Sequence, residues 1–257
     1  MRAVTGQLGQ SLFRWTELPD VADALTAARG AIDELLWRRD IRADAASVTA
    51  ASRFLGARDS AAIEGADIAV VEDSPMGRVL GAAAAVTGEA PAIADVWSTA
   101  PLQALARLHV VAARQHLPED VLGRPRVGDE VPDDPLNSGP APDAATASRR
   151  LALLAELSVD SADVPALAVA GIAHAEMLVT RPFAWGSGLV GRALVRVVLV
   201  ARGVDPSMFS IPEVGMMTLG RPAYVRALRA YEDGKIDDYL LWFSQSIGLG
   251  AQRATTM

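Results

Sequence analysis

The amino-acid sequence predicts an all-α protein, and three observations support this fold class. Alanine, leucine and arginine, which favour helix, are among the most frequent residues. Apolar residues recur at helical spacing through most of the chain, and no series of alternating apolar and polar residues marks the strands of a sheet. With 257 residues, of which 51% are hydrophobic, the chain is long enough for one large domain with a substantial core.

Three segments in the first half of the sequence have a helical pattern. Residues 21–38 and residues 45–65 carry apolar side chains at helical spacing. A third helix is predicted over residues 101–116, because Pro101 is favourable at the first helical position and the apolar residues that follow share one face.

Residues 117–143 differ from these segments and predict a loop. Proline recurs among glycine and acidic residues here, and proline lacks the backbone N–H that regular structure uses. A loop of this length inside a compact domain is usually functional or disordered.

Helical patterns resume after this loop. Residues 188–202 are apolar almost all round, so we expect them to form the central, buried helix, which Gly203 and Pro206 would end. The other helices are expected over residues 144–157, 165–179, 223–231 and 237–250.

Charge and composition exclude several kinds of site. The net charge is −7 and no long Lys/Arg run occurs, so we expect neither nucleic acid nor an anionic membrane as a partner. The absence of cysteine rules out disulfides, thiolate zinc sites and thiol nucleophiles. The first residues lack the apolar core of a signal peptide, and the longest apolar run, residues 193–201, is too short to span a bilayer. We therefore expect a soluble, cytoplasmic protein.

The segment Gly186–Gly191 spells G-x-G-x-x-G and permits three interpretations. A dinucleotide-binding turn would need a strand before it, where Pro182 cannot donate to a ladder, and a strand after it to carry Asp205 to a ribose. Alternatively, the free N–H groups at the start of the long helix form an anion site. In the simplest case, Ser187 only caps that helix.

The segment Arg181–Arg192, RPFAWGSGLVGR, resembles the signature of Fic/Fido proteins, H-P-F-x-(D/E)-G-N-G-R-x-x-R, which lies on a helix–loop–helix. A second segment, Ser60–Gly65, has the sequence SAAIEG and fits the inhibitory pattern of that family, (S/T)-x-x-x-E-(G/N). Residues 105–126 and 221–243 are similar to the segment before the family's substrate-binding flap and to its closing helices. The signature positions that match are Pro182, Phe183, Gly186, Gly188 and Arg192.

The resemblance implies a Fic/Fido-type helical domain around a central buried helix, with an N-terminal helical extension. On this basis residues 1–92 form an N-terminal helical region that carries the inhibitory-type motif. Residues 93–257 form the Fic-like core, and the two regions pack as one unit.

The departures from the signature bear on chemistry. The family reaction moves AMP, or occasionally another phosphate-containing group, onto a protein hydroxyl. The family's first residue is a histidine that removes a proton, but here it is Arg181, which stays protonated. The acid that would hold Mg²⁺ is replaced by Trp185, which offers no oxygen ligand. Ser187 stands at the asparagine position and Leu189 at the first arginine position. The resemblance therefore implies no catalytic residue and no magnesium site.

The other residues of the two motifs have predicted roles in packing, ion pairing or anion binding. Phe183 and Trp185 are expected to fill the pocket, although the Trp185 ring could alternatively be a stacking platform. Glu64 is expected to pair with Arg192 as the inhibitory-type pair. Arg181 would be either a surface cation at a helix end or a phosphate clamp. The candidates for binding an anion, such as a phosphate of ATP or another nucleotide, are Arg181, Gly186, Ser187, Gly188 and Arg192.

The favoured hypothesis is a Fic-fold protein that lacks protein adenylylation activity and acts by binding a partner protein or a nucleotide. Prolines between residues 126 and 144 support it, because a proline-rich flap cannot pair with a target segment. His109, His116 and His174 are expected to be structural. The alternatives are an atypical nucleotidyl or phosphoryl transferase with a remodelled site and, less favoured, a Rossmann-type oxidoreductase.

Overall fold

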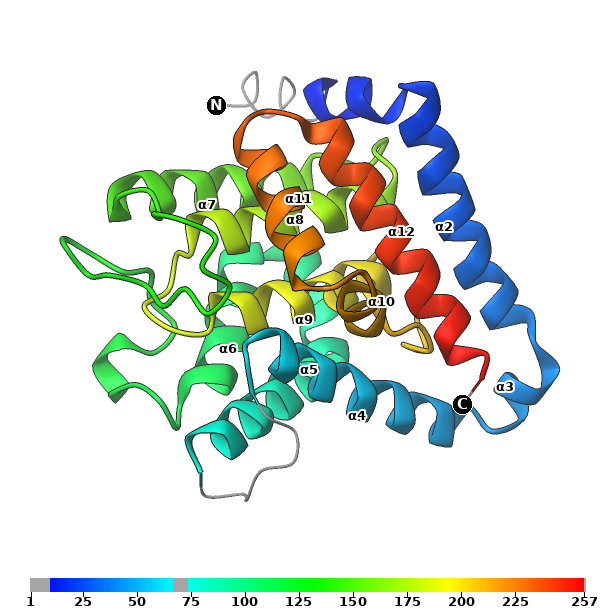
Figure 1. The fold of residues 1–257 in the computed structure, drawn as a ribbon, viewed down its shortest axis with the longest axis horizontal. Coiled ribbons are helices and arrows are strands. Elements are labelled where there is room, and N and C mark those ends of the chain that lie inside the picture. Colours follow the sequence, from blue (N-terminus) through cyan, green and yellow to red (C-terminus); the bar gives the residue numbers. More distant parts are fainter. Residues whose placement is uncertain (1–9, 67–73, 257) are drawn as a thin grey trace.

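The computed structural model describes residues 10–66 and 74–256, and within these ranges the chain forms helices joined by turns and loops, with no strand. The predicted all-α class is therefore confirmed. Figure 1 shows the arrangement of the helices. Residues 10–16 are helical. The later elements are α2 Pro19–Trp37, α3 Arg39–Ala43, α4 Ala45–Ile63, α5 Pro75–Thr99, α6 Pro101–Ala113, the short 3-10 helix η1 Glu119–Val121, α7 Ala144–Val159, α8 Ala166–Thr180, α9 Ser187–Ala201, α10 Pro212–Leu219, α11 Arg221–Glu232 and α12 Ile236–Ala254.

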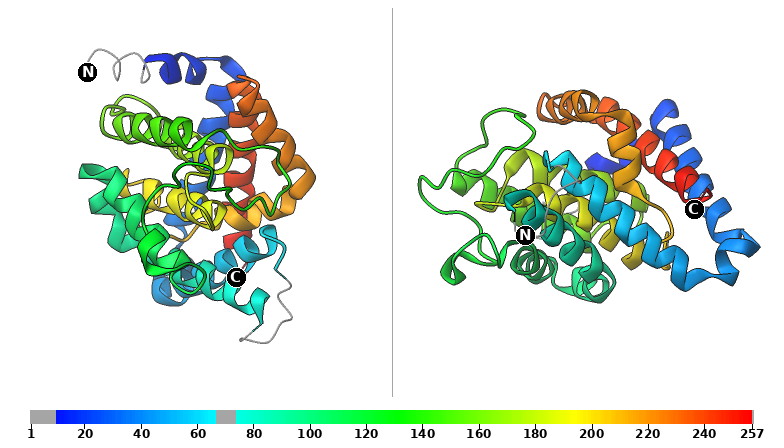
Figure 2. Two further views of the ribbon diagram at one scale, coloured as in Figure 1. Left: turned by 90° about the vertical axis from the view of Figure 1, so that its left-hand side faces the viewer. Right: turned by 60° about the horizontal axis from the view of Figure 1, so that its bottom comes forward.

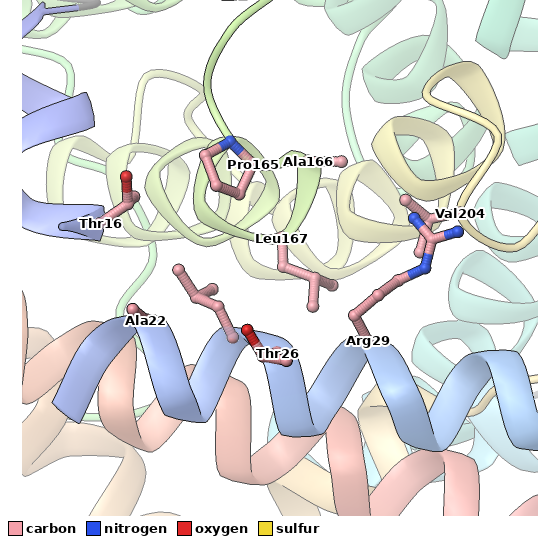
Figure 3. Close-up of a pocket in the computed structure, with 9 residues that line it drawn as sticks. Thr16, Ala22, Thr26, Arg29, Pro165, Ala166, Leu167 and Val204 are labelled. Atoms are coloured by element: carbon pink, nitrogen blue, oxygen red, sulfur yellow. The ribbon is translucent and has the colours of Figure 1, made fainter. Parts of the chain in front are cut away.

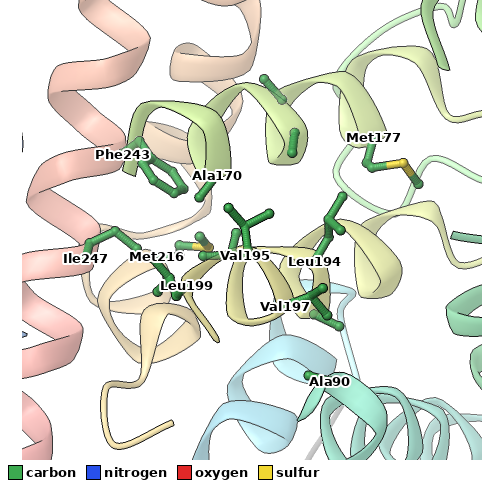
Figure 4. Close-up of a cluster of buried hydrophobic side chains, with 14 of the residues drawn as sticks. Ala90, Ala170, Met177, Leu194, Val195, Val197, Leu199, Met216, Phe243 and Ile247 are labelled. Atoms are coloured by element: carbon green, nitrogen blue, oxygen red, sulfur yellow. The ribbon is translucent and has the colours of Figure 1, made fainter. Parts of the chain in front are cut away.

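The central, buried helix that the sequence predicts is α9. It packs against α5 and α8 on two sides and also contacts α4, α6 and α10. Figure 4 shows Val195 facing Ala170 of α8 and Val197 facing Ala90 of α5. Almost every side chain of α9 is buried, so its first turn is held in a fixed position by packing on all sides.

Two arginines interrupt the apolar surface of α9, and both are buried. Arg196 forms an ion pair with Glu213 of α10, with both N–O contacts at 2.8 Å. It also donates to the hydroxyl and the carbonyl oxygen of Ser52 in α4, at 3.0 and 3.2 Å. Because a buried charge is stable only when it is paired and hydrogen-bonded, Arg196 fixes α4 and α10 against the central helix. Arg192, one turn earlier, contacts the other end of α4.

The apolar periodicity did not predict α5. Pro91 and several glycines lie inside this helix and weaken its local signal. It forms because the Ser74 hydroxyl accepts a hydrogen bond from the Gly77 N–H at 3.0 Å, and because α5 packs against α4, α6 and α9. Residue 92, where the sequence suggested a boundary between two regions, lies within α5, so the two regions share a continuous helix.

Among the described residues, Met76–Thr99 is the one stretch long and apolar enough to cross a bilayer, with a mean hydropathy of 1.3. It belongs to α5, and its buried side chains, such as Ala83 and Ile93, lie in the core. The helix contacts α4, α6, α7 and α9, and 39% of its apolar window is buried.

The remaining helices enclose this centre. α2 and α12 run side by side along one edge of the molecule (Figures 1 and 2). The loop between α6 and α7 lies on the opposite side, where it covers the junction of α8 and α9 (Figure 1). α6 ends at Ala113, three residues before the expected end at residue 116, and the chain then turns toward η1.

Candidate functional site

The Fic-like signature lies at the junction of α8 and α9. Arg181 follows α8 in a left-handed conformation, with φ 42° and ψ 66°, and Gly186 precedes α9 with φ 77°. A positive φ is unusual for arginine and readily adopted by glycine. The Ser187 hydroxyl accepts a hydrogen bond from the Phe183 N–H at 3.2 Å, inside the loop. The expectation that Ser187 caps α9 is therefore wrong, because Gly186 holds that position and gives no side-chain cap.

Arg181 is buried at the end of α8 and points into the site. The residue is 6% exposed, so the interpretation as a surface cation is wrong. Its Nη1 lies 2.7 Å from a carboxylate oxygen of Asp134, and its Nη2 donates to the Gly139 carbonyl oxygen at 2.5 Å. Arg181 therefore holds the loop between α6 and α7, in the place where the resemblance implies a proton-removing histidine.

Asp133, on the same loop, lies against the first turn of α9. Its Oδ2 accepts a hydrogen bond from the Gly186 N–H at 3.2 Å. Burial raises the pKa of Asp133 to about 7, and the negative charge of Glu64 acts in the same direction. The hydrogen bond from Gly186 and the charge of Arg181 act in the opposite direction. The carboxyl group thus occupies the helix terminus where an anion would bind.

Asp134 is held in a network of its own. Its Oδ1 accepts hydrogen bonds from the N–H and the hydroxyl of Ser138, at 3.1 and 3.0 Å, and its Oδ2 accepts one from the Gly139 N–H at 3.2 Å. Burial opposes ionisation of Asp134, but these hydrogen bonds and the Arg181 guanidinium outweigh it and lower the pKa. Asp134 is therefore an ionised partner of Arg181.

Glu64 and Arg192 lie together on the other side of the same turn. They form an ion pair in which the Arg192 side chain is 0% exposed and that of Glu64 is 7% exposed. Arg192 also donates from Nε to the Ser60 hydroxyl at 2.8 Å and from Nη2 to the Ser60 carbonyl at 3.2 Å. A side chain at position 188 would collide with the Glu64 carboxylate, so Gly188 permits the close approach of α4 to α9.

The two aromatic residues of the signature stack on histidines of the α6 region. The rings of Phe183 and His109 are 4.0 Å apart and nearly parallel, and those of Trp185 and His116 are 3.7 Å apart. Burial lowers the pKa of His109 to about 4 and also lowers the pKa of His116. The predicted structural roles of these histidines agree with this arrangement, and both aromatic rings fill space beside the signature loop.

His174 also has a structural environment. Its two ring nitrogens contact the hydroxyls of Tyr239 and Tyr224, at 2.7 and 2.5 Å. Burial lowers its pKa, and the positive charge of Arg192 contributes in the same direction. His174 therefore stays neutral and satisfied by hydrogen bonds inside the core.

The loop between α6 and α7 follows a defined path over the site. Arg126 is buried and donates to the carbonyl oxygens of Arg181 and Thr180, at 2.8 and 3.2 Å. Two main-chain hydrogen bonds join the loop to the signature, from the Arg126 N–H to Pro182 and from the Asp133 N–H to Ala184. A loop held in this way is a structural part of the site.

The cavity that remains at the signature is very small. It has a volume of about 20 Å³, and its lining includes Glu64, Asp133, Arg181 and Gly188. A cavity of this size holds about one water molecule, whereas small-molecule sites usually offer about 300 Å³ or more. A larger pocket of about 320 Å³ lies between α2 and the start of α8, whereas the signature follows the other end of α8 (Figure 3). Its lining is mostly apolar and includes no acid or histidine.

No protein-family model and no curated protein matches the sequence. Solved structures do match. A Fic family protein from Desulfovibrio desulfuricans G20 superposes with a TM-score of 0.72 at 19% identity, over 93% of this chain and 74% of that chain. A fragment of Fic-1 from C. elegans superposes with a TM-score of 0.67 at 16% identity, over 92% and 72% of the two chains. The chain has the Fic fold. With this fold and no strand in the described residues, the Rossmann-type alternative is excluded.

The residues at this Fic-type site do not fit Mg²⁺ or ATP. Trp185 stands where the resemblance places a metal-binding acid, and Asp134 is paired with Arg181. Within the described ranges, no three histidine, aspartate or glutamate side chains gather into a group that could hold a metal ion. The small volume and the carboxylates of Asp133 and Glu64 leave no room for a triphosphate.

The sequence predicted most residues of this site but not the acids of the loop between α6 and α7. Glu64, Gly188 and Arg192 meet at the first turn of α9, as the resemblance implies. Asp133 and Asp134 were not singled out, although two adjacent acids in a segment next to a positively charged motif were a signal that could have found them.

Proposed function

We propose that this protein is a Fic-fold pseudoenzyme, which does not transfer AMP and acts by binding a protein partner. The observation that carries the proposal is the replacement of the base by Arg181, together with the ion pair that this residue makes with Asp134. A guanidinium stays protonated at any pH at which the protein is folded, so it cannot remove a proton from an attacking hydroxyl.

The contacts of α4 also support a site that stays closed. Arg192 binds Ser60 and Glu64 near the end of α4, and Arg196 binds Ser52 two turns earlier. Both guanidiniums are buried, and separating α4 from α9 would take the acid partner away from Arg192 and two hydrogen bonds away from Arg196, which keeps its pair with Glu213 of α10. An inhibitory helix that could move away from the site would need weaker contacts with α9 than α4 has.

The activity test is incubation with ATP labelled on the α-phosphate, Mg²⁺ and a cell lysate, with an active Fic enzyme in the same lysate as the positive control. We expect no labelled protein adduct from the wild-type chain or from Glu64→Gly, which removes the inhibitory-type carboxylate. Calorimetry should show weak or no ATP binding, with little dependence on Mg²⁺. Adduct formation that Arg181→Ala abolishes would overturn the proposal.

One observation favours the alternative of a remodelled transferase. Asp133 faces the first turn of α9, and its pKa of about 7 is suited to a general base. In such an enzyme Asp133, in place of the lost histidine, would take the proton of the attacking hydroxyl. The same adduct assay separates the two functions, because adducts that Asp133→Asn removes and Asp129→Asn preserves would support the transferase.

A further inference from the structure

Residues 131–139, in the loop between α6 and α7, supply two acids to the signature. The Asp133 carboxylate accepts the Gly186 N–H at 3.2 Å, and its backbone N–H donates to the Ala184 carbonyl at 3.0 Å. The start of a helix favours negative charge, because its first N–H groups lack partners within the helix. Asp133 therefore takes the position next to α9 that would suit an external anion.

The second acid satisfies the arginine of the signature. Asp134 forms the ion pair with Arg181, and the Gly139 carbonyl accepts a further hydrogen bond from the same guanidinium. Arg181 is buried, with 6% of the residue exposed. Even so, its Nε has no hydrogen-bond partner within the described part of the chain. A buried guanidinium with a spare donor beside a helix terminus is suited to an anion with more oxygens than one carboxylate offers.

The loop is also held from its outer side. Arg221 donates to the Pro135 carbonyl at 2.5 Å, and Arg229 donates to the Ser138 carbonyl at 3.4 Å. Both arginines come from α11, so the segment is fixed between this helix and the signature. Its side chains reduce the cavity at α9 to about 20 Å³.

We propose that residues 131–139 are a built-in plug, in which the carboxyl groups of Asp133 and Asp134 are the chain's own ligands for the start of α9 and for Arg181. A phosphate-bearing ligand reaches these groups only after the plug is released. This inference rests on the proposed function, because both concern the same closed cavity, and it adds what occupies that cavity.

The test uses inorganic pyrophosphate as the probe and calorimetry as the measurement. The variant Asp133→Asn/Asp134→Asn keeps the size of both side chains and removes their charges. Asp129→Asn is the matched control, since Asp129 is exposed on the same loop and outside the site. In a second variant, residues 131–139 are replaced by a Gly/Ser segment of the same length, and circular dichroism checks that it folds. Amide hydrogen exchange of residues 131–139 and 181–188 reports release of the plug.

We expect the wild-type chain and Asp129→Asn to bind pyrophosphate weakly or not at all. The double variant and the loop replacement should exchange faster in both segments and bind pyrophosphate at least tenfold more tightly. An unchanged rate of amide exchange in the double variant would overturn the proposal. Faster exchange without tighter pyrophosphate binding would overturn it too. Labelled ATP distinguishes the two proposals, because AMP transfer by a released variant would overturn the pseudoenzyme and leave the plug supported.

Discussion

Removing the carboxylate of Glu64 should destabilise the protein by about 3 kcal/mol, because Arg192 would keep a buried charge that no acid balances. The Arg192 side chain is 0% exposed and that of Glu64 is 7% exposed, so neither partner is screened by water. Breaking a buried pair costs about 3–5 kcal/mol. The lower end applies here, since Arg192 in Glu64→Ala retains its two hydrogen bonds to Ser60.

The measurement is urea unfolding of Glu64→Ala, followed by far-ultraviolet circular dichroism. For a chain of this length, a loss of about 3 kcal/mol corresponds to a fall in Tm of roughly 6–12 °C. Asp33→Ala is the control, because its pair with Arg29 lies on the surface, with 46% and 42% of the side chains exposed. That substitution should change the free energy of unfolding by no more than about 0.5 kcal/mol.

The reasoning is refuted if Glu64→Ala loses no more stability than the surface control. Such a result would mean that the end of α4 is separated from α9 in solution and that the pair is hydrated. A further check is Arg192→Met in the Glu64→Ala background. Removing the orphaned charge should recover part of the lost stability, since an apolar replacement of a whole buried pair is often tolerated.

Three further predictions follow from the site. The folded-state pKa of Asp133 is about 7 against an ordinary value of 3.8, so the folded wild type binds a proton that the unfolded chain has lost. Relative to Asp133→Asn, the wild type should therefore lose about 4 kcal/mol of stability as pH rises from about 4 to about 8, with no further change above, and urea unfolding across this range would show it. Gly188→Ala should destabilise the protein by about 1–3 kcal/mol, and by less in the Glu64→Ala background, where the colliding carboxylate is absent. Trp185→Ala should raise the pKa of His116 toward its ordinary value by removing the stacked ring, as followed by NMR titration; an unchanged pKa would count against the stack.

The sequence predicted the helical class and the central helix because those properties depend on local pattern. α9 is apolar on nearly every side, and this alone indicates burial. α5 was missed because Pro91 and its glycines disfavour helix locally, and contacts with four other helices outweigh that preference. Those contacts join residues that are distant in the chain, so a local sequence pattern cannot predict them.

The candidate site was predictable to the extent that the motif fixes it. The pair of Glu64 and Arg192 follows from two short patterns that lie more than a hundred residues apart, a separation that only a resemblance could bridge. The burial of Arg181 could not be predicted in the same way. Its environment depends on Asp134, whose position is set by the hydrogen bonds of a loop with no periodicity. Whether Arg181 is a surface cation could therefore be decided only from the fold, and its role as a phosphate clamp stays a prediction.

The packing around Leu189 predicts that restoring the family signature would not confer AMP transfer on the proposed pseudoenzyme. Leu189, at the first arginine position of the motif, is 1% exposed in the core. Leu189→Arg would bury a charge without a partner and should cost several kcal/mol, roughly 3 or more. Arg181→His would in addition leave Asp134 without its guanidinium. We expect the double substitution to unfold at a markedly lower urea concentration than Arg181→His alone and to transfer no AMP. A stable, active double variant would show that the core around α9 can accept an arginine. It would also show that two substitutions are enough to give this site AMP-transfer activity, against this reasoning.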